Sequence, residues 1–345
     1  MRFLFIFLFV TTLSGSFCHM AHAGYKMQPT AEDQQWLMPD APPFPEDNKP
    51  TSERIELGKV LFFDPRLSGD GMTSCATCHN PGLGWTDGRA KGMGFKGKEL
   101  GRASPTLINA AYSSLQMWDG RKKSLEDQAT GPMSNPDEMH TDMQVMEKWL
   151  NASGEYKILF SKAYPGEAID RATVSKAIAS FERTILSTNS AFDRWLKGDA
   201  KAMTQQQIRG FRLFEDATKG NCAICHSAPN FADDGFHNIG LKSHDEPDAD
   251  MGRFAIRAVP SLKGAFKTPT LRDVAMTAPY FHEGSAKTLM EVVEHYNRGG
   301  DSKKNLSPDI KSLHLSNKEM MDIVAFMAAL TSPQLQVTLP ILPTL

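Results

Sequence analysis

The feature of this sequence that most restricts its fold is a five-residue motif that occurs twice. Residues 75–79 read Cys-Ala-Thr-Cys-His and residues 222–226 read Cys-Ala-Ile-Cys-His. Two thiols one helical turn apart can form thioethers to the two vinyl groups of one porphyrin, and the histidine that follows can bind its iron. The sequence therefore predicts two covalent c-type haems, held by Cys75, Cys78 and His79 and by Cys222, Cys225 and His226.

Other uses of a Cys-x-x-Cys pair explain the motifs less well. A redox disulfide needs no histidine at the fifth position, and a zinc site would use all four thiolates, usually closer together in the sequence. An even number of cysteines in an exported protein can also indicate structural disulfides. Of the five cysteines, Cys18 lies in a segment that we expect to be removed, so the two motifs use all the others. Haem attachment is the favoured interpretation.

The first residues indicate export. Arg2 precedes an apolar run over residues 3–13, and residues 21–23 read Ala-His-Ala, which is typical of a signal-peptide cleavage site. We expect residues 1–23 to be a signal peptide and the mature protein to be periplasmic, with no stable membrane span. The net charge of −2 and the lack of a basic block argue against nucleic acid as a partner.

The length of 345 residues, 41% of them hydrophobic, suits two domains. Few segments alternate with the period of a strand, so we expect a mainly α fold with long loops around the cofactors. We expect an extended lead-in over residues 24–50, a first haem domain over 51–195 and a second over 196–345, with the junction where residues 189–203 lose the helical pattern. Outside the two motifs, the halves show no visible repeat.

Helix signals lie in both expected domains. Apolar spacing and capping residues predict helices after Thr51, over 142–160, over 174–185, after Thr204, over 287–298 and after Ser316. Thr204 with Gln207 and Ser316 with Glu319 have the pattern of capping boxes.

An open iron face separates a peroxide-reacting enzyme from a two-haem electron carrier, whose axial positions are usually both filled. No histidine between residues 80 and 139 could close the first haem. Met93 and Met117 are the nearby sulfur candidates. Core packing explains Met117 better, whereas Met93 lies in a glycine-rich loop and stays open as a ligand. An open first haem is the favoured interpretation.

Several motifs around both sites resemble the bacterial di-haem cytochrome c peroxidases and their relative MauG. They follow the order of that family and lie at residues 118–121, 125–129, 131–139, 267–272 and 277–284. The resemblance runs from about Leu57 to Leu330. It implies two cytochrome c-like domains, an N-terminal haem that reacts with hydrogen peroxide and a C-terminal haem that transfers electrons.

The resemblance also implies roles for three residues. Glu138 and Gln128 would line the distal pocket of the first haem, where a carboxylate can move a proton between the peroxide oxygens and an amide can orient the peroxide. Trp118 would lie between the haems and relay an electron. Without the resemblance, Glu138 would be assigned to the surface and Trp118 to the core.

The sixth ligand of the second haem distinguishes the subfamilies. The peroxidases use a methionine in the helix that includes residues 291–300, and no methionine stands at the matching position here. Tyr296 falls where MauG supplies a tyrosine, and a phenolate would lower the haem potential relative to a thioether. His295 is adjacent and Met290 belongs to the same helix, so both remain alternatives.

The family also places a calcium ion between its domains. Thr277 and Pro279 match positions whose backbone carbonyls bind it, but Ala103 stands where an asparagine is expected. Backbone carbonyls tolerate substitution and calcium accepts water ligands, so one Ca²⁺ remains a hypothesis. His237 resembles a histidine near the second haem of MauG.

Tyr296 and the absent loop histidine make MauG the nearer relative. The sequence thus predicts a periplasmic di-haem oxidoreductase that reacts with hydrogen peroxide and oxidises a protein partner. An example is an amine dehydrogenase precursor that gains a tryptophan-derived quinone, such as the tryptophan tryptophylquinone of methylamine dehydrogenase. One alternative is a cytochrome c peroxidase that takes electrons from cytochrome c or a cupredoxin. Another is a two-haem electron carrier without catalysis.

Overall fold

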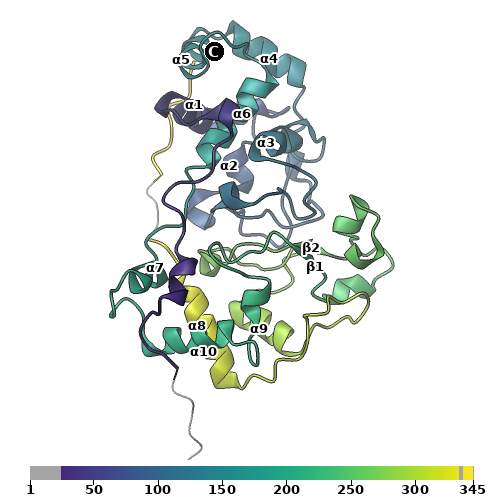
Figure 1. Cartoon of the computed structure of the whole chain (residues 1–345). Helices are drawn as coiled ribbons and strands as arrows, with labels where there is room; N and C mark the ends of the chain where they lie inside the picture. Colours follow the sequence, from purple (N-terminus) through teal and green to yellow (C-terminus); the bar gives the residue numbers. More distant parts are fainter. Residues whose placement is uncertain (1–24, 334–336, 345) are drawn as a thin grey trace, which may run out of the picture.

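The computed structural model describes residues 25–333 and 337–344, so the expected signal peptide lies outside the described residues. The chain forms two helical lobes, one above the other in Figure 1. Two short antiparallel strands, β1 (Phe236–His237) and β2 (Phe266–Lys267), accompany the helices. The expectation of a mainly α fold with long loops is confirmed. Within the described residues, no helix has the length and apolar character needed to cross a bilayer.

The helices divide between the lobes in chain order (Figure 1). The upper lobe contains α1 (Ser52–Phe63), α2 (Cys75–Cys78), α3 (Leu125–Ser134), α4 (Met143–Ala152), α5 (Gly154–Ala163) and α6 (Arg171–Glu182). The lower lobe contains α7 (Ala191–Leu196), α8 (Gln205–Glu215), α9 (Leu289–Asn297) and α10 (Asn317–Ala329).

Capping residues begin the helices where the sequence indicated. The side chains of Thr51, Thr204 and Ser316 each accept a hydrogen bond from a backbone N–H in the first turn, and the last two form the expected capping boxes. The helix expected over residues 142–160 is two helices, because Ser153 ends α4 and caps α5. The expected break at 189–203 contains α7, whose six residues are too few to leave a clear helical pattern.

Each lobe is centred on one pair of crossing helices, α1 with α6 in the upper lobe and α8 with α10 in the lower. A glycine stands at each crossing. A Cβ atom on Gly58 would collide with the carbonyl oxygen of Ala177, and one on Gly210 would collide with that of Asp322. The two backbones of each pair therefore touch, and the rest of the lobe packs around that contact.

These crossings reveal a repeat that we did not detect in the sequence. If Ala177 and Asp322 are equivalent, residues 178–187 align with residues 323–332 without a gap. The alignment pairs isoleucine with isoleucine at the first position, phenylalanine with phenylalanine at the fourth and serine with serine at the last. The two lobes are thus built on one common plan.

The loops that follow α6 and α10 also make equivalent contacts. Asn109 and Asp273 both have a φ of 58°. The Asn109 side chain accepts a hydrogen bond from Ser187 N at 2.9 Å, and the Asp273 side chain accepts one from Ser332 N at 2.7 Å. The hydroxyls of Ser187 and Ser332 lie 2.8 Å apart. Because equivalent residues touch each other only near a twofold relation, the lobes pack about a pseudo-twofold axis at these serines.

Each lobe has its own hydrophobic core, but the ends of the chain cross between them. Trp36, from the expected lead-in, is 2% exposed in the lower core, to which Trp195 of α7 also belongs. Val337 and Leu342 pack against the upper core, and Thr344 N donates a hydrogen bond to Glu155 of α5 at 2.8 Å. Each lobe therefore receives a segment from the far end of the chain, and the boundary expected at 195/196 stays a prediction.

Candidate active site

A cavity of about 610 Å³ lies in the upper lobe next to α2. Cys75, Cys78 and His79 line it, and neither thiol is paired in a disulfide. The His79 Nδ1 lies 3.2 Å from the Trp85 carbonyl oxygen, which favours a proton on Nδ1 and leaves Nε2 free to bind a metal. Burial lowers the pKa of His79, so the ring is neutral, as a ligand must be.

A second cavity, of about 410 Å³, repeats this arrangement in the lower lobe. Cys222, Cys225 and His226 line it. The His226 Nδ1 lies 2.9 Å from the Phe231 carbonyl oxygen, and burial lowers the pKa of this histidine too. Two thiols and a neutral imidazole facing each cavity fit the binding of one haem per lobe.

The helix α9 carries the three candidate sixth ligands of the second cavity. Tyr296 lines the cavity, whereas Met290 packs against the lower core. Both ring nitrogens of His295 are occupied, with Nε2 2.9 Å from the Ile239 carbonyl oxygen and Nδ1 3.0 Å from Asp301 Oδ2. Burial raises the pKa of Tyr296, so its phenolate would form only beside a cation. Of the three candidates, only Tyr296 faces the cavity.

The helix α3 supplies the corresponding positions of the first cavity. Aligning α3 and α9 on their N-caps pairs Gln128 with Val292 and Pro132 with Tyr296. All four residues line their cavities. A proline side chain cannot bind a metal. The position from which Tyr296 could bind an iron in the second cavity therefore offers no ligand in the first cavity.

Glu138 lies just after α3 and lines the first cavity with Gln128. Its Oε1 accepts a hydrogen bond from Asn135 Nδ2 at 2.7 Å, and burial raises the pKa of the carboxyl. The Gln128 Nε2 lies 3.8 Å from the Met117 sulfur. Met117 also lines the cavity, which corrects its assignment to core packing, whereas Met93 is not among the described residues that line it.

Trp118 lines both cavities. Its Nε1 donates a hydrogen bond to the Ala103 carbonyl oxygen at 2.9 Å. The repeat makes His282 its equivalent, and the two rings lie edge to face with centroids 6.4 Å apart. Reciprocal backbone hydrogen bonds join the lobes here, from Lys267 N to Trp118 O at 2.8 Å and from Ala103 N to His282 O at 2.7 Å. Trp118 therefore lies at the junction of the lobes.

Comparison with known proteins identifies the family. A family model described as di-haem cytochrome c peroxidase matches residues 52–201. The chain is 42% identical over 335 residues to the methylamine utilization protein MauG of Methylorubrum extorquens, covering 97% of this chain and 94% of that protein. The chain belongs to the di-haem cytochrome c peroxidase and MauG family.

Two further relatives represent other members of this family. The cytochrome c551 peroxidase of Nitrosomonas europaea is 36% identical over 294 residues, which cover 85% of this chain and 84% of that protein. The crystal structure of a MauG-like protein associated with microbial copper homeostasis matches with a TM-score of 0.80 at 31% identity, covering 86% of this chain and 95% of that one. The chain is thus a di-haem oxidoreductase of peroxidase type, and its family implies two haems, peroxide and a redox protein partner.

The calcium site typical of this family stays a prediction. Thr277 and Pro279 both line the first cavity, and the Thr277 hydroxyl donates to the Val274 carbonyl oxygen at 3.1 Å. Ala103 offers only its backbone, and its carbonyl oxygen already accepts the hydrogen bond from Trp118. A calcium ion here would therefore rely on other backbone carbonyls and on water.

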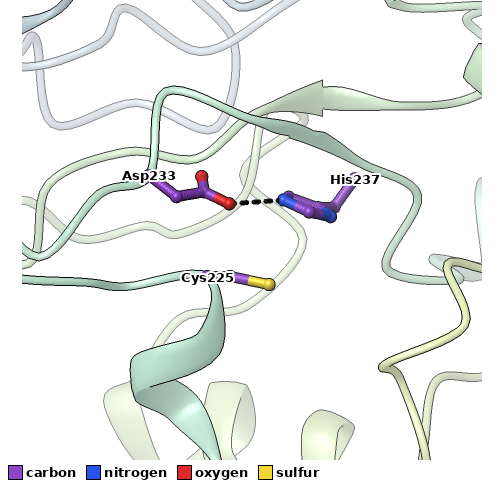
Figure 2. Close-up of side chains that lie close together, drawn as sticks. All are labelled: Cys225, Asp233 and His237. Carbon is purple, nitrogen blue, oxygen red and sulfur yellow. Dashed lines mark hydrogen bonds and ion pairs between the residues drawn. The ribbon is translucent and has the colours of Figure 1, made fainter.

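Figure 2 shows a different cluster, Cys225, Asp233 and His237, beside the second cavity. The His237 Nε2 lies 2.8 Å from Asp233 Oδ2. Burial opposes ionisation of Asp233, but its hydrogen bonds, first that with His237, lower its pKa to about 2. The hydrogen bond with Asp233, followed by one with Cys225, raises the pKa of His237 to about 10. Because Cys225 belongs to a haem motif, we interpret the cluster as an ion pair at the haem edge.

Sequence reasoning placed His237 near the second haem but missed Asp233. It also missed Pro132 and a buried carboxyl, Glu182, which lines the first cavity. The helices that carry Pro132 and Glu182 are the ones that repeat between the lobes. Separate alignments of α3 with α9 and of α6 with α10 pair these positions with Tyr296 and Met327.

Proposed function

We propose that the chain attaches one haem covalently in each cavity and uses them in the periplasm to oxidise a protein partner with hydrogen peroxide. The thioethers would form on Cys75 and Cys78 and on Cys222 and Cys225. His79, His226 and Tyr296 would bind the irons. When bound, the haems supply the iron that reacts with peroxide and the redox centres that exchange electrons with the partner.

Glu138 and Gln128 would control protons and orientation in the first cavity. As a carboxylate, Glu138 can accept the proton of one peroxide oxygen and return it to the other, so that the O–O bond breaks and water leaves. The Gln128 amide can hold the peroxide by a hydrogen bond. Overall, hydrogen peroxide gains two electrons and two protons and gives two waters, and the partner loses the two electrons.

One observation carries the MauG-like proposal: Tyr296 faces the second cavity at the position that Pro132 holds in the first. A phenolate stabilises oxidised iron more than a thioether does, which suits the oxidation of a partner better than the storage of an electron. Trp118 at the junction would carry electrons between the cavities. By similarity to a methylamine utilization protein, we propose an amine dehydrogenase precursor as the partner, with formation of a tryptophan-derived quinone such as tryptophan tryptophylquinone.

The alternative is a cytochrome c peroxidase that removes peroxide with electrons from cytochrome c or a cupredoxin. It is favoured by the 36% identity to a cytochrome c551 peroxidase over 84% of that protein. Both functions share the chemistry of Glu138 and differ in what supplies the electrons.

The test is a set of electronic and spin-resonance spectra of the purified diferric protein, before and after one equivalent of peroxide. We expect one high-spin and one low-spin haem, reaction without prior reduction, and oxidation of a purified amine dehydrogenase precursor. Tyr296→Phe should lose the oxidation of the precursor, whereas Met290→Leu should keep it. The proposal would be contradicted by two low-spin haems that do not react with peroxide until one of them has been reduced. Full oxidation of the precursor by the Tyr296→Phe variant would contradict it as well.

Calcium belongs to the same proposal, held by the carbonyl oxygens of Thr277 and Pro279. Metal analysis of the purified protein should then find one calcium per chain, and chelation should alter the spectrum of the first haem. A calcium-free preparation with an unchanged spectrum would remove the ion from the proposal.

A further inference from the structure

The repeat between the lobes places a carboxyl beside the first haem where the second lobe has a thioether. Five residues after each helix crossing, α6 carries Glu182 and α10 carries Met327. Each is 4% exposed and each lines the cavity of its own lobe. The residues four positions earlier, Ile178 and Ile323, line the two cavities in the same way. At this matched position, the upper lobe has a side chain that can ionise and the lower lobe has one that cannot.

Glu182 has no counter-charge of its own. Its Oε2 is buried and has no hydrogen-bond partner among the described residues. The neighbouring Arg183 is engaged elsewhere, because its guanidinium makes a bidentate pair with Glu126 at 2.7 and 3.0 Å and donates to the Pro43 carbonyl oxygen at 3.1 Å. A buried carboxyl without a partner is held as the neutral acid unless something compensates its charge.

The charged groups around Glu182 do not reverse this preference. Burial raises the pKa of Glu182 to about 8, Arg183 opposes that rise and Glu126 of α3 adds to it. Cys75 of α2 is a further titratable neighbour, and a thioether at Cys75 carries no charge. Glu138 lines the same cavity and is itself a carboxyl whose pKa burial raises. On its other side, α6 meets α1 through the Gly58 contact and buried apolar side chains. A haem in this cavity would displace water and strengthen the effect of burial.

We infer that Glu182, in addition to Glu138 in the same cavity, is a proton-exchanging group of the first haem, which releases a proton when that haem is oxidised and takes one up when it is reduced. When one electron passes from the bound haem to an external acceptor, such as the electrode in the titration below, the Glu182 carboxyl would release one proton to solvent, so that the net charge of the buried cavity does not change. The inference rests on haem occupancy of the first cavity and requires neither peroxide nor the partner. At the matched position of the second lobe, Met327 carries no proton that it could exchange.

The two haems should therefore respond differently to pH. Ionised Glu182 stabilises the oxidised first haem, so the potential of that haem falls as the pH rises through the titration range of the carboxyl. Within that range the equilibrium constant for reduction changes by up to tenfold per pH unit, which is about 59 mV for one electron. Met327, at the matched position, can contribute no such change to the potential of the second haem.

The experiment is a spectroelectrochemical titration of both haems in the purified holoprotein from pH 6 to pH 10, a range set by the raised pKa of about 8. We expect the pH dependence of the first haem to fall in Glu182→Gln, which keeps the shape and the neutral form, to the part that Glu138 contributes. It should persist in Glu182→Asp and in Glu53→Gln, a control at an exposed position of α1. An unchanged slope in Glu182→Gln, or a flat wild type, would overturn the inference.

Two further measurements keep the inference testable if Glu182→Gln binds haem poorly. Oxidation of the wild-type first haem should remove the infrared C=O stretch of a protonated carboxylic acid, and Glu182→Asp should shift that band. Met327→Glu should increase the pH dependence of the second haem above that of the wild type. No change of the carboxylic band in the wild type would refute the inference. Because these titrations contain neither peroxide nor partner, their failure would leave the proposed function intact.

Discussion

The two lobes share a scaffold but differ at the positions that face their cavities. Both lobes have a glycine at the helix crossing and a hydrogen bond between the motif histidine and a backbone carbonyl oxygen. Both also have a side chain, Asn109 or Asp273, that accepts a hydrogen bond from a serine N–H. The differences, upper lobe first, are Gln128 against Val292, Pro132 against Tyr296, Trp118 against His282 and Glu182 against Met327. The comparison teaches that one scaffold can present two chemically different cavities through a few side chains, and the proposed roles of the two haems rest on these differences.

The largest expected effect concerns Glu138, the proposed acid–base group of the upper lobe. Glu138→Gln should slow the reaction with peroxide by about 10²–10⁴-fold, because the amide cannot accept the proton. In the wild type this rate should fall as the pH drops through the pKa of Glu138, which burial raises above its ordinary value. Stopped-flow kinetics over a pH series measures both. A Glu138→Gln rate equal to the wild type would exclude Glu138 as the base.

The next effect tests whether the two helix crossings are equivalent. Gly58→Ala and Gly210→Ala should each lower the free energy of unfolding by about 1–3 kcal/mol or more, because the new methyl group meets a backbone carbonyl that cannot move aside easily. Denaturant unfolding of the holoprotein measures this, with Gly154→Ala as the control because open space surrounds that position. A large cost at one crossing and none at the other would break the comparison.

Replacement of the residue at the junction should separate the two lobes functionally. Trp118→Phe removes the hydrogen bond to the Ala103 carbonyl oxygen, which costs about 1 kcal/mol of stability. It should also slow the oxidation of the partner while the initial reaction with peroxide keeps its rate. Parallel stopped-flow and partner-oxidation assays distinguish these steps. Equal slowing of both would mean that Trp118 shapes the first cavity rather than joining the two.

The smallest effect concerns the ion pair of the lower lobe. The folded pKa of Asp233 is lowered, so its stabilisation is present above the ordinary aspartate pKa and is lost as the pH falls towards about 2. The folded pKa of His237 is raised, so its contribution is lost as the pH rises through the range up to about 10. Asp233→Asn should therefore cost roughly 1 kcal/mol at neutral pH and little near pH 2. A thermal-unfolding series across pH tests this, and a cost that does not vary with pH would argue against an ion pair.

Local signals in the sequence predicted much of the fold. The haem motifs are contiguous, and Thr51, Thr204 and Ser316 cap helices through residues at most three positions away. Such short-range chemistry can be recognised without the fold. The division at Ser153 was missed because a capping serine inside a long apolar pattern resembles an ordinary helical residue.

The features that the sequence did not predict depend on contacts between distant parts of the chain. No local pattern indicates that both nitrogens of His295 are occupied, because Ile239 supplies one of the two acceptors from another segment. Tyr296 could therefore be favoured from the sequence only by resemblance. The repeat escaped notice for a similar reason: the lobes share backbone contacts and cavity positions, while most of their side chains differ.

The crossing of the chain ends has a consequence for how the molecule is assembled. Trp36 can be buried only after the residues of the lower core have been made. The upper core gains Val337 and Leu342 only when the last segment of the chain packs against it. The upper core thus cannot be completed before the last segment of the chain is available. The haems would then be attached before the core of either lobe is fully packed, and the two ends of the chain would complete the packing.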